Sequence, residues 1–419
     1  MVLNQRAILG AAALLCAGLA AAEPAFELHD GDRVAFYGDS ITAQRFYTRD
    51  VEDYVATRYP RLQVRFHNAG VPGDSVHGGY TGDVVTRVDR DLKPWAPTVV
   101  TVMLGMNDGG YVPPDAKILA AYEAGYAKLL GLLRAAAPQA RMTLLENTPY
   151  DEITHGTEFT GYMATTVQNA RASAALAARE QLPVVDTSTP VTAFLKRARA
   201  ADLSFASLLV PDRIHPAEPL HWLVAAELMR AWHLDPVVSA VAIDARQRRV
   251  TQAERTAVSD LAGDGRKLEW KQQDEALPLP FDFENAFMNF VLRHSDLFAQ
   301  DQETLRVQGL QAGRYALQID GMAVGEFTAR QLAQGLNLAT MKTPMWRQAR
   351  EFDAKLGERS LLESADLTLG YSTQVAERAQ AAQILREGQA EIEQKNRQTV
   401  QPVMHHYVLA AVAANRGKR

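Results

Sequence analysis

Four short stretches of the chain carry side chains that could act together in acyl transfer. Ser40 lies in "GDSIT", directly behind a short apolar run, while Gly73 lies in "NAGVPGDSV" and Asn107 in "LGMNDGG". Asp212 and His215 lie three positions apart in "VPDRIHPAEP". A hydroxyl, an imidazole, a carboxylate and donors for a developing negative charge are the parts that serine acyl transfer needs. The residue types and their order therefore favour that chemistry.

Each stretch, taken alone, also has an ordinary structural explanation. Serine is a good helix N-cap, glycine is common in turns, and a loop asparagine usually satisfies nearby backbone groups. In the chemical interpretation, Asp212 fixes one imidazole nitrogen of His215 while the other nitrogen faces the hydroxyl of Ser40. Asp74 and Asp108 follow the predicted donors and are expected to brace their loops. The joint occurrence of the four stretches makes the chemical interpretation the stronger one.

Strand-like and helix-like segments alternate around these stretches. Apolar runs typical of buried strands occupy residues 33–38, 64–70, 98–105, 141–147 and 183–187. Helical periodicity occupies residues 46–59, 80–92, 115–137, 157–181 and 217–232. Such alternation predicts a parallel sheet with helices on both faces. Ligands bind beyond the carboxyl ends of the strands in these sheets, and three of the four stretches directly follow a strand candidate.

The four stretches together resemble the sequence blocks of the SGNH (GDSL) hydrolases, over roughly residues 30 to 235. The resemblance implies a flavodoxin-like, three-layer α/β/α fold around a five-stranded parallel sheet, and ester hydrolysis without metal or cofactor. It implies that Ser40 is the nucleophile, that His215 is the base and that Asp212 orients it. The N–H groups of Ser40 and Gly73 and the side chain of Asn107 would form the oxyanion hole.

The composition is that of an ordinary globular protein, and its 419 residues are enough for more than one domain. The formal net charge of −5 argues against non-specific nucleic-acid binding, which needs a basic surface. Residues 1–22 predict a cleaved signal peptide and a periplasmic or secreted product; a retained anchor is the alternative. Cys16, the only cysteine, lies in this segment, so the mature chain would have no thiol, disulfide or thiolate metal site. No later apolar run is long enough to cross a bilayer.

The sequence pattern changes near residue 235. We predict a catalytic domain over residues 23–235, a β-rich accessory region over 236–342, and a helical C-terminal region over 343–419. The β-rich region could bind carbohydrate, mediate oligomerisation or cover the active site, and its sequence favours none of these. Residues 375–398 predict a solvated helix, with a partner-binding or lid helix as the alternative.

Other residues could contribute to a site. His67 and His77 flank the Gly73 stretch, but their spacing fits no helix-borne or finger-type metal site, so no metal is expected. Arg45 and Glu146 could contact a substrate. Aromatic residues that could line a sugar-binding surface, or belong to the core, are Tyr37, Tyr111, Tyr150 and Trp222.

These observations predict a secreted serine esterase. Short acyl groups on carbohydrate, acetyl above all, are the preferred substrates, because no long apolar lid accompanies the four stretches. A lysophospholipase, or a lipid esterase or thioesterase of broad specificity, is the first alternative. A non-catalytic binding module with an inherited pocket is the second. The expected partner is a small-molecule or polysaccharide ester, while neither nucleic acid nor stable membrane insertion is expected, and the sequence leaves the oligomeric state open.

Overall fold

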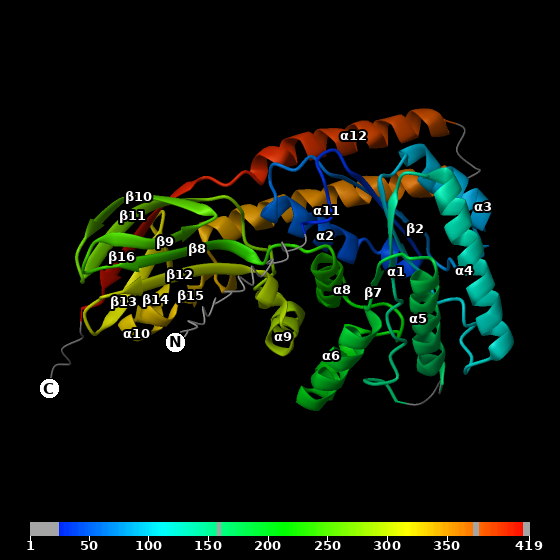
Figure 1. The fold of residues 1–419 in the computed structure, drawn as a ribbon, viewed down its shortest axis with the longest axis horizontal. Helices are drawn as coiled ribbons and strands as arrows, with labels where there is room; N and C mark the ends of the chain where they lie inside the picture. The colour runs from blue at the N-terminus through cyan, green and yellow to red at the C-terminus, as the bar shows by residue number, and fades with distance from the viewer. Residues whose placement is uncertain (1–24, 157–160, 372–376, 414–419) are drawn as a thin grey trace, which may run out of the picture.

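A computed structural model describes residues 25–156, 161–371 and 377–413. The expected signal peptide at residues 1–22 lies outside them. Figure 1 shows an α/β part and a β-rich part, joined along one side by two long helices. Within the described residues, no helix combines the length and the apolar character that crossing a bilayer requires.

A five-stranded parallel sheet forms the centre of the α/β part, as expected. Its strands are β1 (Arg33–Gly38), β2 (Arg65–Gly70), β5 (Val99–Met103), β6 (Arg141–Leu145) and β7 (Val184–Val185). They lie in the order β2-β1-β5-β6-β7. In the register, Gly38 of β1 faces both Gly70 of β2 and Met103 of β5, so the loops that follow these three strands leave the sheet side by side.

Helices cover both faces of this sheet and bury its apolar strands, which confirms the three-layer fold. One face packs against α2 (Phe46–Arg58), α6 (Ser188–Ala201) and α8 (Glu218–Ala231). The other packs against α4 (Ala116–Ala136) and α5 (Tyr162–Arg179). Short turns complete this part: α1 (Ser40–Ala43), α7 (Leu203–Ala206) and the 3-10 turns Lys93–Trp95 and Ser207–Leu209.

The helix expected over residues 80–92 begins later than the periodicity indicated. Two short strands, β3 (Gly78–Gly79) and β4 (Gly82–Asp83), first form a small hairpin. Helix α3 (Val84–Arg87) then begins, because the Asp83 side chain caps it by accepting a hydrogen bond of 2.9 Å from the Thr86 N–H. A π-helical turn, Val88–Leu92, follows.

The β-rich part is a sandwich of two sheets, with strand orders β10-β11-β16-β13-β14 and β15-β12-β8-β9. The strands are β8 (Val237–Asp244), β9 (Arg249–Glu254), β10 (Thr256–Gly263), β11 (Lys267–Asp274), β12 (Gln302–Gln308), β13 (Arg314–Ile319), β14 (Met322–Thr328), β15 (Leu336–Asn337) and β16 (Met404–Ala411). Its smaller helices are α10 (Ala329–Gln334) and the 3-10 turn Leu338–Thr340. Helix α9 (Ala286–His294) and the 3-10 turn Leu297–Gln300 instead pack against the α/β part, where α9 contacts α6 and α8. Asp320 and Gly321 form the turn between β13 and β14.

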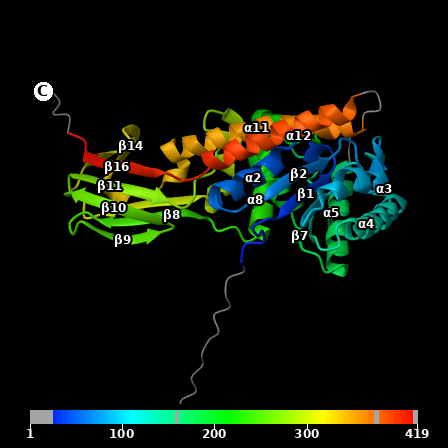
Figure 2. The same ribbon diagram turned by 90° about the horizontal axis from the view of Figure 1, so that it is seen from above.

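Two long helices, α11 (Pro344–Tyr371) and α12 (Arg378–Thr399), form an antiparallel pair, here called the helical hairpin. It runs from the β-sandwich across the α/β part (Figures 1 and 2). The sandwich end of α11 packs into the sandwich core through residues such as Met345 and Phe352. Helix α12 occupies the predicted segment 375–398, of which residues 375 and 376 lie outside the described residues.

The helical region expected over residues 343–419 is wrong at its end, where strand β16 forms. Pro402 interrupts the preceding helix. The side chains of His405, Tyr407 and Leu409 then alternate into the sandwich and are buried. Strand β16 pairs antiparallel with both β11 and β13, so it lies in the middle of its sheet. Because every second side chain is buried in the sandwich, this segment forms a strand instead of continuing the helix.

Candidate active site

The first and fourth stretches meet at the carboxyl edge of the parallel sheet. Ser40 begins α1 directly after β1, and His215 lies three residues before α8. His215 Nε2 lies 2.7 Å from Ser40 Oγ, and His215 Nδ1 lies 2.5 Å from Asp212 Oδ2. An imidazole held in this way between a carboxylate and a hydroxyl can take the hydroxyl proton and activate the oxygen as a nucleophile.

The carboxylate of Asp212 is fixed by its own loop. Its Oδ1 accepts hydrogen bonds from the backbone N–H groups of Ile214 (3.0 Å) and His215 (2.8 Å). Burial alone would raise the pKa of Asp212, but hydrogen bonds from the His215 side chain and from these two N–H groups outweigh burial and lower it. The carboxylate therefore stays ionised and can stabilise a positively charged imidazole.

Three loops carry the predicted oxyanion donors. Ser40 is the first residue of α1, so its N–H has no partner within the helix, and Gly73 lies in a turn closed by a 3.2 Å hydrogen bond from the Asp74 N–H to the Val71 carbonyl. Gly73 has φ +72°, which a residue with a side chain rarely adopts. Within the described residues, the N–H groups of Ser40 and Gly73 have no intramolecular acceptor. Both are therefore available to a developing oxyanion.

Asn107 is held by both ends of its carboxamide. Its Nδ2 donates to the Asp74 carbonyl at 2.8 Å, and its Oδ1 accepts from the Tyr111 hydroxyl at 2.9 Å. The amide orientation is therefore defined, and its second N–H hydrogen has no acceptor among the described residues. Tyr111 itself has φ +59°, which is unusual for a residue with a bulky side chain. Sequence reasoning did not predict the contact between Tyr111 and Asn107.

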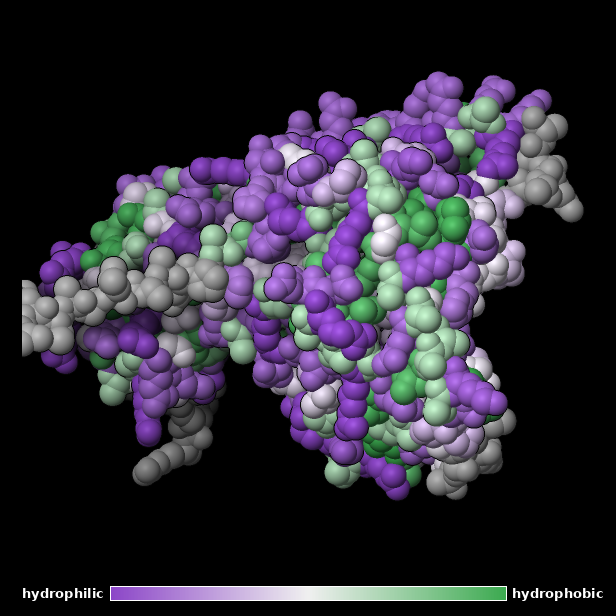
Figure 3. All heavy atoms as spheres, turned by 45° about the vertical axis from the view of Figure 1, so that its right-hand side comes forward, coloured by the Kyte–Doolittle hydropathy of each residue, from purple (hydrophilic) through white to green (hydrophobic). Residues whose placement is uncertain are grey.

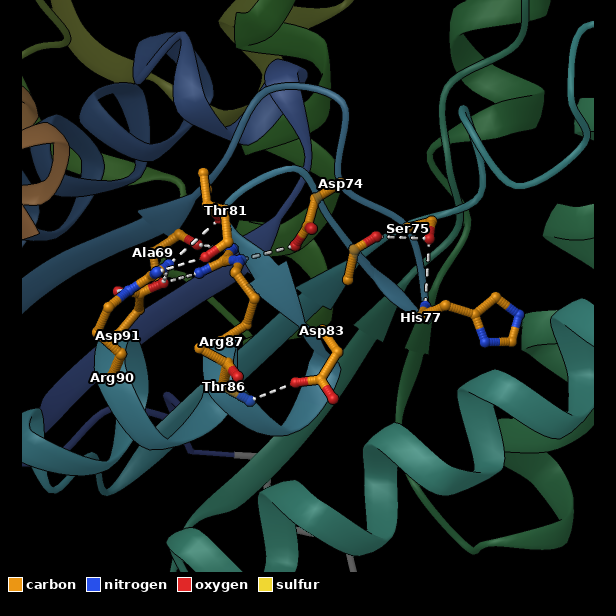
Figure 4. Close-up of polar contacts among 12 residues, drawn as sticks. Ala69, Asp74, Ser75, His77, Thr81, Asp83, Thr86, Arg87, Arg90 and Asp91 are labelled. Carbon is orange, nitrogen blue, oxygen red and sulfur yellow. Dashed lines mark hydrogen bonds and ion pairs between the residues drawn. The ribbon is translucent and has the colours of Figure 1, made fainter. Parts of the chain in front are cut away.

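A buried arginine braces the loop that carries Gly73 (Figure 4). Arg87 Nε donates to Asp74 Oδ2 at 2.9 Å, and its Nη2 donates to the Ala69 carbonyl at 2.8 Å. Arg90 donates to the Thr81 carbonyl at 2.6 Å on the far side of the same loop. The third loop is tied to this one as well, because Asp108 Oδ1 accepts from the Val76 N–H at 2.9 Å. The bracing roles expected for Asp74 and Asp108 are confirmed.

His221 connects the histidine loop to the helix behind the serine, and sequence reasoning missed it. It is fully buried on α8, its Nδ1 accepts from the Tyr47 N–H at 3.3 Å, and its Nε2 donates to the Pro216 carbonyl at 3.1 Å. Burial lowers its pKa to about 3, so the ring stays neutral. A histidine inside an apolar helical run gives no signal in the sequence beyond that of a core residue.

The remaining candidates from the sequence divide into core and surface. Tyr37, Tyr150 and Trp222 are buried, whereas Tyr111 is 45% exposed. Glu146 faces Asp186 instead of the serine, and burial together with this neighbouring charge raises its pKa to about 7. No three His, Cys, Asp or Glu side chains within the described residues are arranged to hold a metal ion.

Arg45 and His67 do not reach the serine either. Both contact Glu363 of α11, at 3.5 Å for Arg45 Nε and 3.3 Å for His67 Nδ1.

Comparisons with solved structures found several similar chains. BT4096, described as a gut microbial diltiazem-metabolizing enzyme, has a TM-score of 0.82 at 23% identity, covering 92% of this chain and 98% of that chain. The acetylxylan esterase Axe2 from Geobacillus stearothermophilus has a TM-score of 0.39 at 24% identity, covering 49% of this chain and 96% of its own. A catalytic mutant of Axe2 has a TM-score of 0.41 at 23% identity, with the same coverage of both chains. The first likeness shows a shared fold.

No curated protein matches the chain. The family model described as "GDSL-like Lipase/Acylhydrolase family" matches residues 36–223. That range contains all four stretches singled out above, from Ser40 to His215, and it ends before the β-sandwich and the helical hairpin. This match identifies residues 36–223 as a GDSL-like, or SGNH, hydrolase domain and the protein as a serine ester hydrolase.

Proposed function

We propose that the protein is a secreted serine esterase that removes short acyl groups, acetyl above all, from carbohydrate. In this proposal Ser40 is the nucleophile, His215 the general base and Asp212 the residue that orients it. The observation that carries the proposal is the position of the His215 ring, 2.7 Å from the Ser40 hydroxyl and 2.5 Å from the Asp212 carboxylate.

The reaction proceeds in two halves. Ser40 Oγ attacks the ester carbonyl carbon while His215 Nε2 takes its proton, and Asp212 stabilises the charged imidazole. The oxyanion accepts hydrogen bonds from the N–H groups of Ser40 and Gly73 and from the Asn107 amide. The alcohol leaves with the proton from His215, and an acyl-serine remains. Water, deprotonated by His215, then hydrolyses this ester and frees the acid.

Two exposed tyrosines support a ring-shaped alcohol group in the substrate. Tyr80 is 72% exposed, and a side chain added at Gly73 would meet its ring at 4.0 Å. Tyr111 is 45% exposed and binds Asn107 on the other side of the predicted oxyanion hole. Aromatic faces in this position can pack against the C–H face of a pyranose. Figure 3 shows one face of the molecule, on which hydrophilic residues surround smaller apolar patches.

One observation favours the lipid esterase as the second candidate. Leu203 and Leu208 are 47% and 52% exposed on the segment that leads to Asp212. Exposed leucines close to a catalytic loop could receive an acyl chain. The length of the acyl group therefore separates the two candidates.

The test compares initial hydrolysis rates on p-nitrophenyl esters from acetate to dodecanoate for the wild type and Ser40→Ala. We expect a Ser40-dependent rate that falls steeply beyond butyrate, followed by acetate release from acetylated oligosaccharides. A maximum at long chains would move the function to lipid esters. A non-catalytic binding module would show no Ser40-dependent rate and no covalent labelling of Ser40 by a fluorophosphonate.

Secretion rests on residues 1–22 and has its own test. Expression of the full chain in a bacterial host should yield exported protein that begins near Glu23, as measured by N-terminal sequencing. Recovery of an intact Met1 terminus would contradict a cleaved signal.

A further inference from the structure

We propose that Glu363 of α11 is a positioning residue for the nucleophile and the Gly73 loop, which makes the helical hairpin a structural part of the active site. Glu363 lies 140 positions beyond the end of the matched family domain at residue 223. The inference rests on the proposed roles of Ser40 and Gly73. It is carried by the contacts of one buried carboxylate with two segments of the α/β part.

The first contact is with the backbone of β2. Glu363 Oε1 accepts a hydrogen bond of 2.9 Å from the Asn68 N–H. Strand β2 is at the edge of the parallel sheet, so one side of its backbone has no neighbouring strand to pair with. The carboxylate supplies the missing acceptor there. It fixes the edge strand just before the loop that carries Gly73.

The Asn68 side chain connects this contact to the nucleophile helix and to the strand end before Gly73. Its Nδ2 donates to the carbonyl of Thr42, in the short helix that Ser40 begins, at 2.7 Å. Its Oδ1 accepts from the Gly70 N–H at 3.0 Å, three residues before Gly73. A shift of Asn68 would therefore move the nucleophile and an oxyanion donor relative to each other.

The second contact is with the junction of α1 and α2. Arg45 has φ +65°, and its Nη1 donates to the Ala43 carbonyl at 2.9 Å, so the guanidinium holds the end of the nucleophile helix. This guanidinium is buried, with Nε 3.5 Å from Glu363 Oε2. A buried positive charge needs a partner, and Glu363 is the carboxylate paired with it.

The electrostatics show that the charge of Glu363 matters as well as its shape. Burial alone would raise the pKa of Glu363, but the hydrogen bond with His67 and the charges of Arg45 and Arg359 lower it to about 2. A glutamine could accept from Asn68 but would leave the Arg45 guanidinium without its negative partner. Glu363→Gln is therefore an informative substitution that changes the side-chain volume very little.

The same helix provides a matched control. Asp353 of α11 also reaches the α/β part, where its Oδ1 lies 3.1 Å from Arg49 Nε on α2. It contacts neither Asn68 nor Arg45. Asp353→Asn therefore weakens the attachment of the helical hairpin without touching the proposed route to Ser40.

The experiment measures kcat and KM on p-nitrophenyl acetate for the wild type, Glu363→Gln, Glu363→Asp and Asp353→Asn. Circular dichroism melting curves establish that each variant is fully folded at the temperature of the assay. We expect Glu363→Gln to lower kcat at least 10-fold with KM within twofold, Glu363→Asp to recover part of the loss, and Asp353→Asn to keep kcat within twofold. Fluorophosphonate labelling of Ser40 should slow in parallel with kcat. If Glu363→Gln does not fold, the comparison of kcat between Glu363→Asp and Asp353→Asn decides the question.

Two results would overturn the inference: a folded Glu363→Gln with kcat within twofold of the wild type, or an equal loss in Asp353→Asn. An inactive wild type would instead reject the proposed function. Hydrogen exchange tests the positioning independently of activity, because residues 38–46 and 66–73 should exchange faster in Glu363→Gln than in Asp353→Asn. Equal exchange in the two variants would count against the inference.

Discussion

Replacing Asn107 by alanine tests the proposed oxyanion hole most directly. The carboxamide uses one N–H hydrogen on the Asp74 carbonyl and its oxygen on the Tyr111 hydroxyl, which leaves one hydrogen for the substrate. The alanine variant removes this donor and leaves the N–H groups of Ser40 and Gly73 in place. Part of the stabilisation of the transition state should therefore be lost, and part should remain.

The expected magnitude follows from the loss of a single fixed donor. Such a loss costs about 10²- to 10³-fold in kcat, or about 2.7 to 4 kcal/mol of transition-state stabilisation. Tyr111→Phe removes only the bond that orients the carboxamide, and one neutral hydrogen bond contributes about 0.5 to 1.5 kcal/mol. We therefore expect roughly a 2- to 12-fold loss of kcat for Tyr111→Phe. KM should change little in either variant, because the donor acts mainly on the oxyanion.

The assay is steady-state hydrolysis of p-nitrophenyl acetate by the wild type, the two single variants and the double variant. If Tyr111 acts only through Asn107, Tyr111→Phe has no further effect on kcat once Asn107 is alanine. A fully folded Asn107→Ala variant that keeps kcat within fivefold of the wild type would refute the reasoning. Simple additivity in the double variant would instead assign Tyr111 a direct contact with the substrate.

Three further predictions concern the base and the buried charges. Asp212→Asn should lower kcat about 10³- to 10⁴-fold without unfolding the protein, as measured by ester hydrolysis beside circular dichroism, because the imidazole loses its orienting carboxylate. In the folded protein the pKa of Glu363 is lowered to about 2, against about 4.3 in the unfolded chain. The ionised carboxylate therefore contributes about 3 kcal/mol to the free energy of unfolding above pH 5, and this contribution is lost as the pH falls towards 2. Urea unfolding should accordingly show a smaller deficit for Glu363→Gln at pH 3 than at pH 7. Burial raises the pKa of Asp39 to about 7, so the stabilisation linked to this group is present below about pH 4 and lost as pH rises through 7. The unfolding free energy of Asp39→Asn, which keeps the cap acceptor for the Ile41 N–H, should therefore rise relative to the wild type between pH 5 and pH 8.

The sequence was sufficient for the α/β part and for the grouping of the candidate site because both depend on local patterns. Strand ends and short motifs coincide along the chain, so the pattern alone assigns Ser40, Gly73 and Asn107 to one sheet edge. The position of His215 against Ser40 was predicted differently, from the spacing of Asp212 and His215 and from the family resemblance, because that stretch follows no strand. The first residue of a helix was harder to predict. At Gly82 and Asp83, for example, a short strand and a helix cap make the helix begin later than its periodicity indicated.

Long-range burial of charge left no local signal. The charged residues of α2 are typical of a solvated helix face, yet Asp50, Glu52 and Asp53 are all buried. They are covered because α11, some 300 positions later, packs on this face, with Arg359 paired to Glu52. The link from Glu363 to Asn68 spans 295 positions and depends on the same packing. Motifs could identify the candidate reacting groups but not the helix that we propose positions them.

The connectivity of the C-terminal part explains how the helical hairpin can hold that position. The chain leaves the β-sandwich at α11 and returns to it at β16, which pairs with β11 on one side and β13 on the other. Both ends of the hairpin are therefore fixed in one sandwich core, while its middle meets α2 and β2 through ion pairs and the Glu363 carboxylate. Ordering a carboxylate on a flexible tail would cost conformational entropy and weaken its contacts, whereas a carboxylate on a helix fixed at both ends is already oriented. Removing the chain from Pro344 onwards would take away a central strand together with the hairpin. The proposed role of the hairpin in catalysis can therefore be tested only by point substitutions such as Glu363→Gln.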